Sequence, residues 1–235
     1  MSSIVVAGDT SGSITISAPA VSGSNTLSLP AVTDTLVGKA TTDTLTNKTL
    51  VAPALGTPAS GVLTNCTGVA KAALPAGSVL QVVHTNFTST ASSTSATPAN
   101  VSGFSATITP SSASNKILVF VSVQFGGANE AFGYVLLLRG ATSIAVGTSA
   151  TGSRINTFLS GTIANAAASS PYTFNPATKS FLDSPATTSP TTYQIQLATG
   201  YNSNAAYINR QGEAADNAGY IQYPTSSITL MEIAG

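Results

Sequence analysis

Few side chains in this sequence have the chemistry that catalysis requires. His84 is the only histidine and Cys66 is the only cysteine. A Ser–His–Asp triad or a histidine-based metal site would have to use His84, but it stands in the strand-like run QVVHTNF without a second His or Cys beside it. Cys66, in LTNCTG, has no basic neighbour that would favour a thiolate. We therefore predict structural roles for both residues, with no catalytic residue, no metal site and no cofactor.

The acidic residues do not indicate a catalytic site either. A glycosidase needs two carboxylates facing each other across the scissile bond, and the chain has eight acidic residues in all, with none between Asp43 and Glu130. Glu213 and Asp216, in RQGEAADNAG, are close enough to meet, but such a loop is typical of a solvated tip. Phosphate-binding GxxxxGK[ST] and dinucleotide-binding GxGxxG motifs are absent. The sequence predicts that the protein is not an enzyme, and a polysaccharide depolymerase is the least favoured alternative.

Tyrosine and amide side chains are concentrated in residues 201–223. They combine a flat apolar face with hydrogen-bond donors and acceptors, which suits a saccharide or protein surface. The alternative is that these tyrosines belong to the core or to a subunit interface. The predicted receptor contacts are Tyr201, Asn202, Asn204, Tyr207, Asn209, Arg210 and Tyr220.

The elements that must position these side chains are strands. Short runs of strand-forming residues recur from Ser78 onward with turn residues between them. No convincing amphipathic helix interrupts them, so the pattern predicts an all-β, jelly-roll-like β-sandwich over residues 78–235, a C-terminal knob. We expect strands at 78–88, 104–109, 116–125, 132–139, 142–147, 191–199, 205–210 and 226–233. Residues 150–180 give no clear strand pattern.

Two of these runs predict more than a strand. KILVFVSVQF at 116–125 begins with apolar residues on both faces, which indicates a central strand. In TTYQIQLAT at 191–199, strict alternation points Tyr193, Ile195 and Leu197 towards the core.

An eleven-residue repeat precedes the knob: SGSITISAPAV at 11–21 and SGSNTLSLPAV at 22–32. Each unit predicts a Gly-marked turn, a strand of about five residues and a Pro that ends it. One unit cannot bury its apolar face alone, so further units or sister chains must cover it; the alternative is a hairpin packed on the larger domain. We predict a repetitive shaft or anchor over 1–50, with inter-chain contacts at Ile14, Ile16, Leu27, Leu29, Leu45 and Leu50.

Residues 51–77 form the predicted connector between shaft and knob. Pro53, Pro58 and Pro75 exclude a long helix, and VAKAAL at 69–74 has room for one helical turn.

Charge is scarce throughout the chain. Charged residues make up 7% of the sequence, against about 25% in ordinary domains, and eight basic residues balance eight acidic ones. Scattered basic residues exclude phosphate-backbone recognition, so no nucleic-acid partner is expected. A neutral surface favours burial in a permanent assembly. The longest apolar run, 117–123, is far shorter than the roughly 18 residues of a membrane span, and no signal peptide is recognisable, so we expect no membrane insertion.

The phrase TDTLTNKTL, followed by VAPALGTPASGVLTNCTGV, resembles a segment common in bacteriophage tail-fibre and related virion proteins. The upstream SGSITISAPAVSGSNTLSLPAVTDTLVG resembles the same family. Three C-terminal runs, ITPSSASNKILVFVSV, SFLDSPATTSPTTYQIQL and SSITLMEI, resemble a distal domain of phage fibres. The motifs are low in complexity, so the resemblance rests on their order along the chain.

That resemblance implies a structural virion protein, most often a homotrimer, synthesised in the cytoplasm of the bacterial host. Its N-terminal part would attach to the tail, the baseplate or an adaptor, and its C-terminal knob would contact a saccharide or protein on the host surface. It implies no catalytic residues. A capsid or tail decoration (cement) protein is the alternative within the same class.

Overall fold

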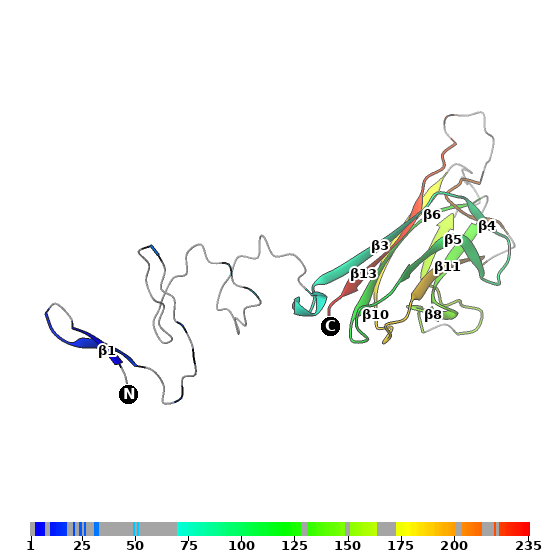
Figure 1. The fold of residues 1–235 in the computed structure, drawn as a ribbon. Coiled ribbons are helices and arrows are strands. Elements are labelled where there is room, and N and C mark those ends of the chain that lie inside the picture. The colour runs from blue at the N-terminus through cyan, green and yellow to red at the C-terminus, as the bar shows by residue number, and fades with distance from the viewer. Residues whose placement is uncertain are drawn as a thin grey trace. The chain divides into compact units, whose positions relative to one another are not determined.

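The structure is a computed structural model of the chain. It describes residues 3–7, 10–17, 21, 24, 26, 31–32, 49, 51, 70–127, 131–148, 151–163, 173–200, 204–212, 219 and 221–235. Contacts divide the chain into two units, Met1–Val62 and Leu63–Gly235, which Figure 1 colours from blue to red along the sequence. The predicted boundaries at residues 50 and 77 stay predictions.

The first unit contains an antiparallel hairpin of β1 (Ser3–Ala7) and β2 (Ser13–Ser17). Its register places Ile4 opposite Ile16 and Val6 opposite Ile14. β2 is the strand that the first eleven-residue repeat predicts, whereas β1 lies before the repeat begins. For Ile14 only the backbone position is described. The other predicted shaft contacts, Leu27, Leu29, Leu45 and Leu50, lie outside the described residues, so the repetitive shaft also stays a prediction.

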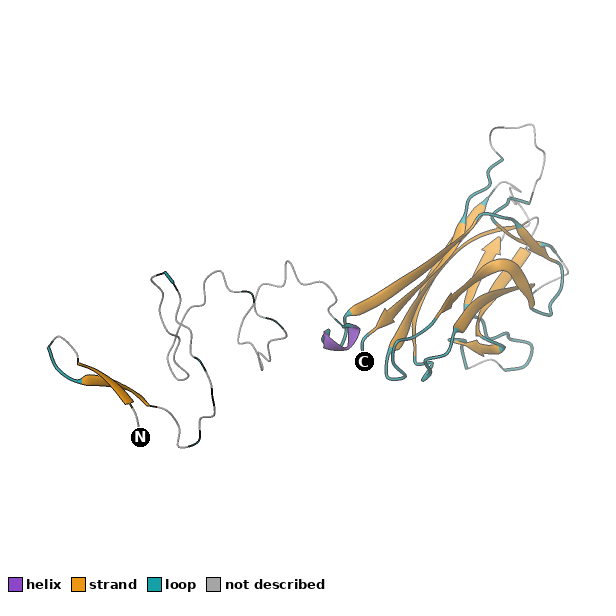
Figure 2. Cartoon of the chain, viewed as in Figure 1, coloured by secondary structure: helices purple, strands orange, loops and turns teal. Residues whose placement is uncertain are grey.

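The second unit is a β-sandwich, which confirms the all-β prediction (Figure 2). We call its first layer the β6 sheet: six strands in the order β3-β13-β6-β12-β4, with β10 on the opposite edge of β6. The strands are β3 (Val79–Phe87), β4 (Ala91–Ser93), β6 (Lys116–Gly127), β10 (Phe174–Asp183), β12 (Ala206–Ile208) and β13 (Ser226–Ile233). β13 and β12 follow one another along the same edge of β6, because β13 pairs with its first half and β12 with its last residues.

We call the second layer the β7 sheet: five strands in the order β5-β11-β7-β8, with β9 also paired to β7. The strands are β5 (Ala99–Ile108), β7 (Ala131–Arg139), β8 (Thr142–Ile144), β9 (Leu159–Ile163) and β11 (Thr191–Thr199). The predicted inward residues of β11, Tyr193, Ile195 and Leu197, are at most 2% exposed. Strict alternation therefore placed this strand correctly.

The predicted helical turn is also present, as a 3-10 helix over Lys71–Ala73. Its flanking residues Ala70 and Leu74 both have extended backbone angles, so the turn does not continue into a longer helix. Among the residues that the structure describes, no helix has the length and apolar character needed to cross a bilayer.

In the second unit, sequence patterns miss three strands: β4, β9 and β10. β10 contains Pro176 and Lys179 within the pattern FNPATKSFLD, and an internal Pro argues against a central strand. Within the described residues, however, β10 pairs with β6 alone. It is therefore an edge strand, where a residue without an N–H is tolerated.

The interpretation of 116–125 as a central strand is confirmed, because β6 is paired along both edges. Its inward residues Ile117, Val119 and Val121 are at most 1% exposed. The outward residues differ from the expectation of burial on both faces: Leu118 is half-buried and Phe120 is 43% exposed. The strands of the sandwich thus cover only one face of this strand.

Three residues from different strands hold the two layers close together. The ring of Phe125, on β6, lies against Gly133 of β7 and Gly161 of β9, which are opposite each other in the register. A Cβ at Gly161 would overlap the Phe125 ring, and one at Gly133 would press on Phe125 and Ala206. The missing side chains of the glycine pair therefore make the space that the ring fills.

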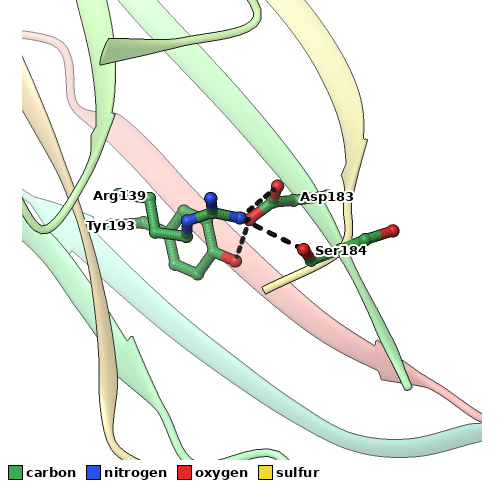
Figure 3. Close-up of polar contacts among 4 residues, drawn as sticks. All are labelled: Arg139, Asp183, Ser184 and Tyr193. Carbon is green, nitrogen blue, oxygen red and sulfur yellow. Dashed lines mark hydrogen bonds and ion pairs between the residues drawn. The ribbon is translucent and has the colours of Figure 1, made fainter. Parts of the chain in front are cut away.

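A buried polar cluster joins the sheets at one edge (Figure 3). Arg139 Nη1 donates to both carboxylate oxygens of Asp183, at 2.8 and 2.9 Å, and to the Ser184 carbonyl oxygen at 3.3 Å. The Tyr193 hydroxyl donates to Asp183 Oδ2 at 2.7 Å. Burial, and then the hydrogen bond to Asp183, raise the pKa of the Tyr193 phenol. Since Asp183 is on β10 and its partners Arg139 and Tyr193 are on β7 and β11, the cluster links the β6 sheet to the β7 sheet.

Asp183→Asn is expected to lower the free energy of unfolding by about 1–3 kcal/mol, because the Arg139 guanidinium loses its charged partner. The Arg139 side chain is 33% exposed, so water screens part of the interaction and the loss stays below that of a fully buried pair. Urea titration of the full chain measures the effect, and Tyr193→Phe is the matched variant that removes only the hydroxyl. A change in Asp183→Asn no larger than about 0.5 kcal/mol, the scatter of surface substitutions, would contradict a linking role.

Candidate functional site

Strand β12 carries Tyr207 on the outer face of the β6 sheet. Tyr207 lies opposite Ser92 of β4 on one side and Gly126 of β6 on the other. Its neighbours Ala206 and Ile208 are fully buried, whereas Tyr207 is only half-buried. The alternation of a strand, with a period of two residues, therefore directs the phenol ring outward.

Asn209 ends β12 and turns the chain. Its backbone is in the left-handed region, with φ +61°, which Asn tolerates better than most residues. Its side-chain amide donates to the carbonyl oxygens of Phe87 at 2.7 Å and Ser89 at 2.9 Å, and its oxygen accepts from the Ser226 hydroxyl at 2.6 Å. Asn209 is 0% exposed. The prediction that Asn209 contacts a receptor is therefore wrong: the nitrogen and the oxygen of its side-chain amide are both used to fix the turn.

Arg210 follows directly and stacks on Tyr207. Its Cζ atom lies 4.4 Å from the centroid of the Tyr207 ring, a cation–π contact worth about 0.5–1 kcal/mol at an accessible site. Its Nε donates to the Gln211 carbonyl oxygen at 3.3 Å, and the Gln211 side-chain oxygen accepts from the backbone N–H of Gln222 at 2.9 Å. The Arg210 carbonyl passes so close to Gly126 that a Cβ there would overlap it, so this glycine is required for the approach.

The structure thus brings two predicted receptor residues together, Tyr207 and Arg210, and excludes Asn209. Asn204 is half-buried just before β12. The remaining three, Tyr201, Asn202 and Tyr220, lie outside the described residues. Receptor contact stays a prediction for the six residues other than Asn209. Among these six, only the Tyr207–Arg210 pair has a defined geometry.

A depression of about 250 Å³ between β4 and β5 adjoins this pair. It is lined by Thr90, Ala91, Ser92, Ser93, Ala99, Asn100, Val101, Ser102 and Leu197. Ser92, one of these residues, is opposite Tyr207 in the register, so the depression and the aromatic ring belong to neighbouring strands. Sequence analysis missed these residues, since Ser and Thr are too common in the chain to mark a site. We call Tyr207, Arg210 and this depression the β12 surface.

The β12 surface has the chemistry of a binding site for polar, oxygen-rich groups. A guanidinium offers donors in a planar fork that suits carboxylates and paired hydroxyls, and stacking on Tyr207 holds it in one orientation. Hydroxyl and amide groups in the depression supply both donors and acceptors. Saccharides, including acidic ones, present the groups that such a surface can bind.

The two carboxylates in the described residues face inward and are bonded. Asp183 belongs to the cluster in Figure 3. Glu232 on β13 is 0% exposed and accepts from the Ser111 N–H and hydroxyl, the Asn115 amide at 2.6 Å and the Gln81 amide at 2.6 Å. Burial by itself raises the pKa of Glu232, but hydrogen bonds from Asn115, Ser111 and Gln81 outweigh burial and lower it.

The remaining residues considered for catalysis or metal binding are His84, Cys66, Glu213 and Asp216. His84 Nδ1 lies 2.8 Å from the Thr229 hydroxyl on the neighbouring strand. Within the described ranges, no three His, Cys, Asp or Glu residues come together in a way that would hold a metal ion. Cys66, Glu213 and Asp216 lie outside those ranges, so the carboxylate pair that a depolymerase needs is not tested.

Comparisons with known proteins identify no family. No family model matches the sequence, and no curated protein matches it. Among solved structures, the chain has partial similarity to one titled "Structure of infectious bursal disease virus Gt strain", with 12% identity and a TM-score of 0.34. The match covers 76% of this chain and 43% of that chain. A superposition this loose supports no conclusion about function.

Proposed function

We propose that this chain is a structural protein of a bacteriophage particle: a homotrimeric tail fibre. Its N-terminal part attaches to the tail, the baseplate or an adaptor, and its C-terminal sandwich contacts the host surface. The chain is synthesised in the bacterial cytoplasm and works on the virion. The observation that carries the proposal is the apolar surface of the β1–β2 hairpin, which its own two strands leave exposed.

Four large apolar residues of that hairpin are 52–67% exposed: Ile4, Val5, Val6 and Ile16. Two-stranded hairpins are at best marginally stable in water, and exposed β-branched residues on open strand edges favour pairing with other chains. Sister chains, or a partner on the particle, would bury these side chains. Such an assembly would stabilise the hairpin and keep these side chains from water.

The strand order of the sandwich supports a viral role. We infer that it is a jelly roll, since two four-strand sets, β3-β13-β6-β10 and β5-β11-β7-β9, face each other and the chain passes between them repeatedly. Jelly rolls are frequent in viral structural proteins and in lectins. The fold alone does not decide function, but it agrees with the order of fibre-like motifs in the sequence.

Host contact is assigned to the β12 surface. Its Tyr–Arg pair beside hydroxyl-lined strands suits a surface saccharide or an acidic protein patch. The dedicated catalytic carboxylate pair of a depolymerase is not needed for this role, and binding alone explains the residues present.

Arg210→Ala is expected to weaken adsorption of the purified chain to host cells about tenfold, the loss typical of a central Arg contact. Stability should change by no more than about 2 kcal/mol, because only the cation–π contact and the long hydrogen bond to the Gln211 carbonyl oxygen are lost. Fluorescently labelled chain on host cells gives the binding constant. Arg154→Ala, at an exposed arginine elsewhere on the sandwich, is the matched control. Equal adsorption of both variants, with the fold intact, would remove the β12 surface from the proposal.

The position of the protein on the particle distinguishes a tail fibre from a decoration or cement protein. The same exposed hairpin would suit a decoration or cement protein that clamps capsid or tail subunits. Immunogold labelling of particles with antibody to the sandwich should mark the free ends of fibres at the tail. Label spread over the head would replace the fibre proposal with decoration.

A further inference from the structure

The outer face of the β6 sheet carries a row of apolar side chains across four strands. Register places Val82 of β3 opposite Met231 of β13, Met231 opposite Leu118 of β6, and Leu118 opposite Leu182 of β10. Figure 1 shows these strands side by side in one sheet. Residues directly opposite on one face are close enough to touch, so the four form a continuous band.

The exposed fractions of these side chains confirm that the band points away from the core. Val82 is 54% and Leu182 is 48% exposed, while Met231 and Leu118 are half-buried between them. The next row adds Phe120, at 43%. We call these five residues the apolar band.

The band has no charge within it. The following row contains His84, Thr229 and Ser180 around Phe120, and the nearest cation is Lys116, one row towards the start of β6. An apolar patch bordered by polar residues is typical of a protein contact. The run KILVFVSV also has the composition of a strand that is covered on both faces, yet the sandwich covers only one.

The position of the band indicates what covers it. Val82 and Leu118 lie near the beginnings of β3 and β6, and Leu182 and Met231 near the ends of β10 and β13. Because the strands are antiparallel, all four sit at the end of the sheet where the preceding chain, Ala70–Ser78, joins β3. Leu74 and Val79, along this entry, are also exposed.

We infer that the apolar band is where sandwiches of sister chains meet around the axis of the trimer, an inference that rests on the proposed function. Chains joined through their N-terminal parts hold the entry ends of their sandwiches near one another, which raises their effective concentration at this end. An uncharged band packs against its own copies without burying an unpaired charge. A heterotypic partner would gain no advantage from the tether.

Phe120→Lys in the full chain tests the contact. It is expected to weaken association between chains about tenfold or more, since each copy brings a charge into an apolar contact. Phe132→Lys is the matched control: Phe132 is 37% exposed on β7, in the other sheet. Sedimentation of both variants over a dilution series gives the association constants. If Phe120→Lys associates as tightly as Phe132→Lys, the band adds nothing to the strength of association, and cross-linking then decides whether the bands meet at all.

If the N-terminal parts alone hold the trimer together, Phe120→Lys would not change its mass. A second measurement therefore tests directly whether the bands of two chains lie close together. In a Cys66→Ser background, Phe120→Cys should give covalent dimers with a short bis-maleimide, whereas Phe132→Cys should stay monomeric on a denaturing gel. Absence of dimers from the Phe120→Cys chain overturns the inference. So does a Phe120→Lys chain that keeps its mass but loses host-cell binding, because the band would then be a receptor surface.

These results are separable from the fibre proposal. Suppose that the wild-type chain is trimeric and the gold label is found at the tail, but the Phe120 variants give the same results as the Phe132 variants. Then only the inferred contact between apolar bands is wrong. If gold label is found on the head, the fibre proposal fails whatever the band does.

Discussion

Phe125→Ala is expected to lower the free energy of unfolding by about 3–5 kcal/mol, the usual loss for a fully buried phenylalanine. Phe125 is 0% exposed and is part of the main core. Its ring occupies the space above Gly133 and Gly161. Since those two glycines have no side chains that could move inward, the cavity left by Ala cannot collapse easily. A loss of this size is a large part of the 5–15 kcal/mol that stabilises most domains.

Urea titration at fixed chain concentration measures this loss. The chain has no tryptophan but seven tyrosines, and buried Tyr193 makes near-ultraviolet circular dichroism a suitable probe of packing. Phe132→Ala, at a partly exposed ring on β7, should cost much less, about 1 kcal/mol or below. If Phe125→Ala lowers the free energy of unfolding as little as Phe132→Ala does, the packing of the Phe125 ring over the glycine pair does not stabilise the sandwich.

Glu232→Ala is expected to cost about 3 kcal/mol or more. Four hydrogen bonds from Ser111, Asn115 and Gln81 end on this carboxylate, and each donor left buried without an acceptor costs about 1–3 kcal/mol. These bonds join β13 to β3 and to the segment between β5 and β6, beside a cavity of about 450 Å³ lined by Ser111, Asn115 and other residues. Loss of the carboxylate should therefore loosen this end of the sandwich.

The same group predicts a pH dependence. The pKa of Glu232 lies below its ordinary 4.5 in the folded state, so the unfolded chain binds more protons between the two values. Stability from this group is complete above pH 4.5 and is lost as the pH falls through the folded pKa. Glu232→Gln keeps the size but presents an amide N–H₂ to neighbouring donors. It should lower stability at pH 7 and remove the Glu232 contribution to the acid dependence.

Urea titrations of wild type and Glu232→Gln from pH 7 down to pH 3 compare the two slopes. The wild type should lose more stability on acidification than the variant, so that the difference between them narrows. Parallel curves for the two chains would show that the carboxylate is not the stabilising form.

The sequence predicted the strands whose alternation is regular, and it missed strands whose position depends on pairing. β11 was placed correctly with its inward residues because a strand buried on one face must alternate with a period of two. β10 was missed because Pro176 disfavours a strand unless the strand lies at an edge, and edge position depends on which strands pair. At the candidate site, residue types identified Tyr207 and Arg210 as surface groups but assigned Asn209 the same role. The left-handed turn that buries Asn209 depends on Phe87, Ser89 and Ser226, which are distant in sequence.

By itself, then, the sequence determined the all-β class, the central position of β6 and the shortage of charge that favours an assembly, because periodicity and composition are local properties of the chain. Only the tertiary structure decided that Phe125 lies over a glycine pair, that Asp183 and Glu232 are bonded inward, and that Val82, Leu118, Leu182 and Met231 share one row. Each of these depends on the register between strands far apart in the sequence, and register is set by the packing of the whole sandwich. The exposed apolar hairpin and the apolar band follow from both levels: their residues are apolar by sequence, and the strands around them leave these side chains exposed.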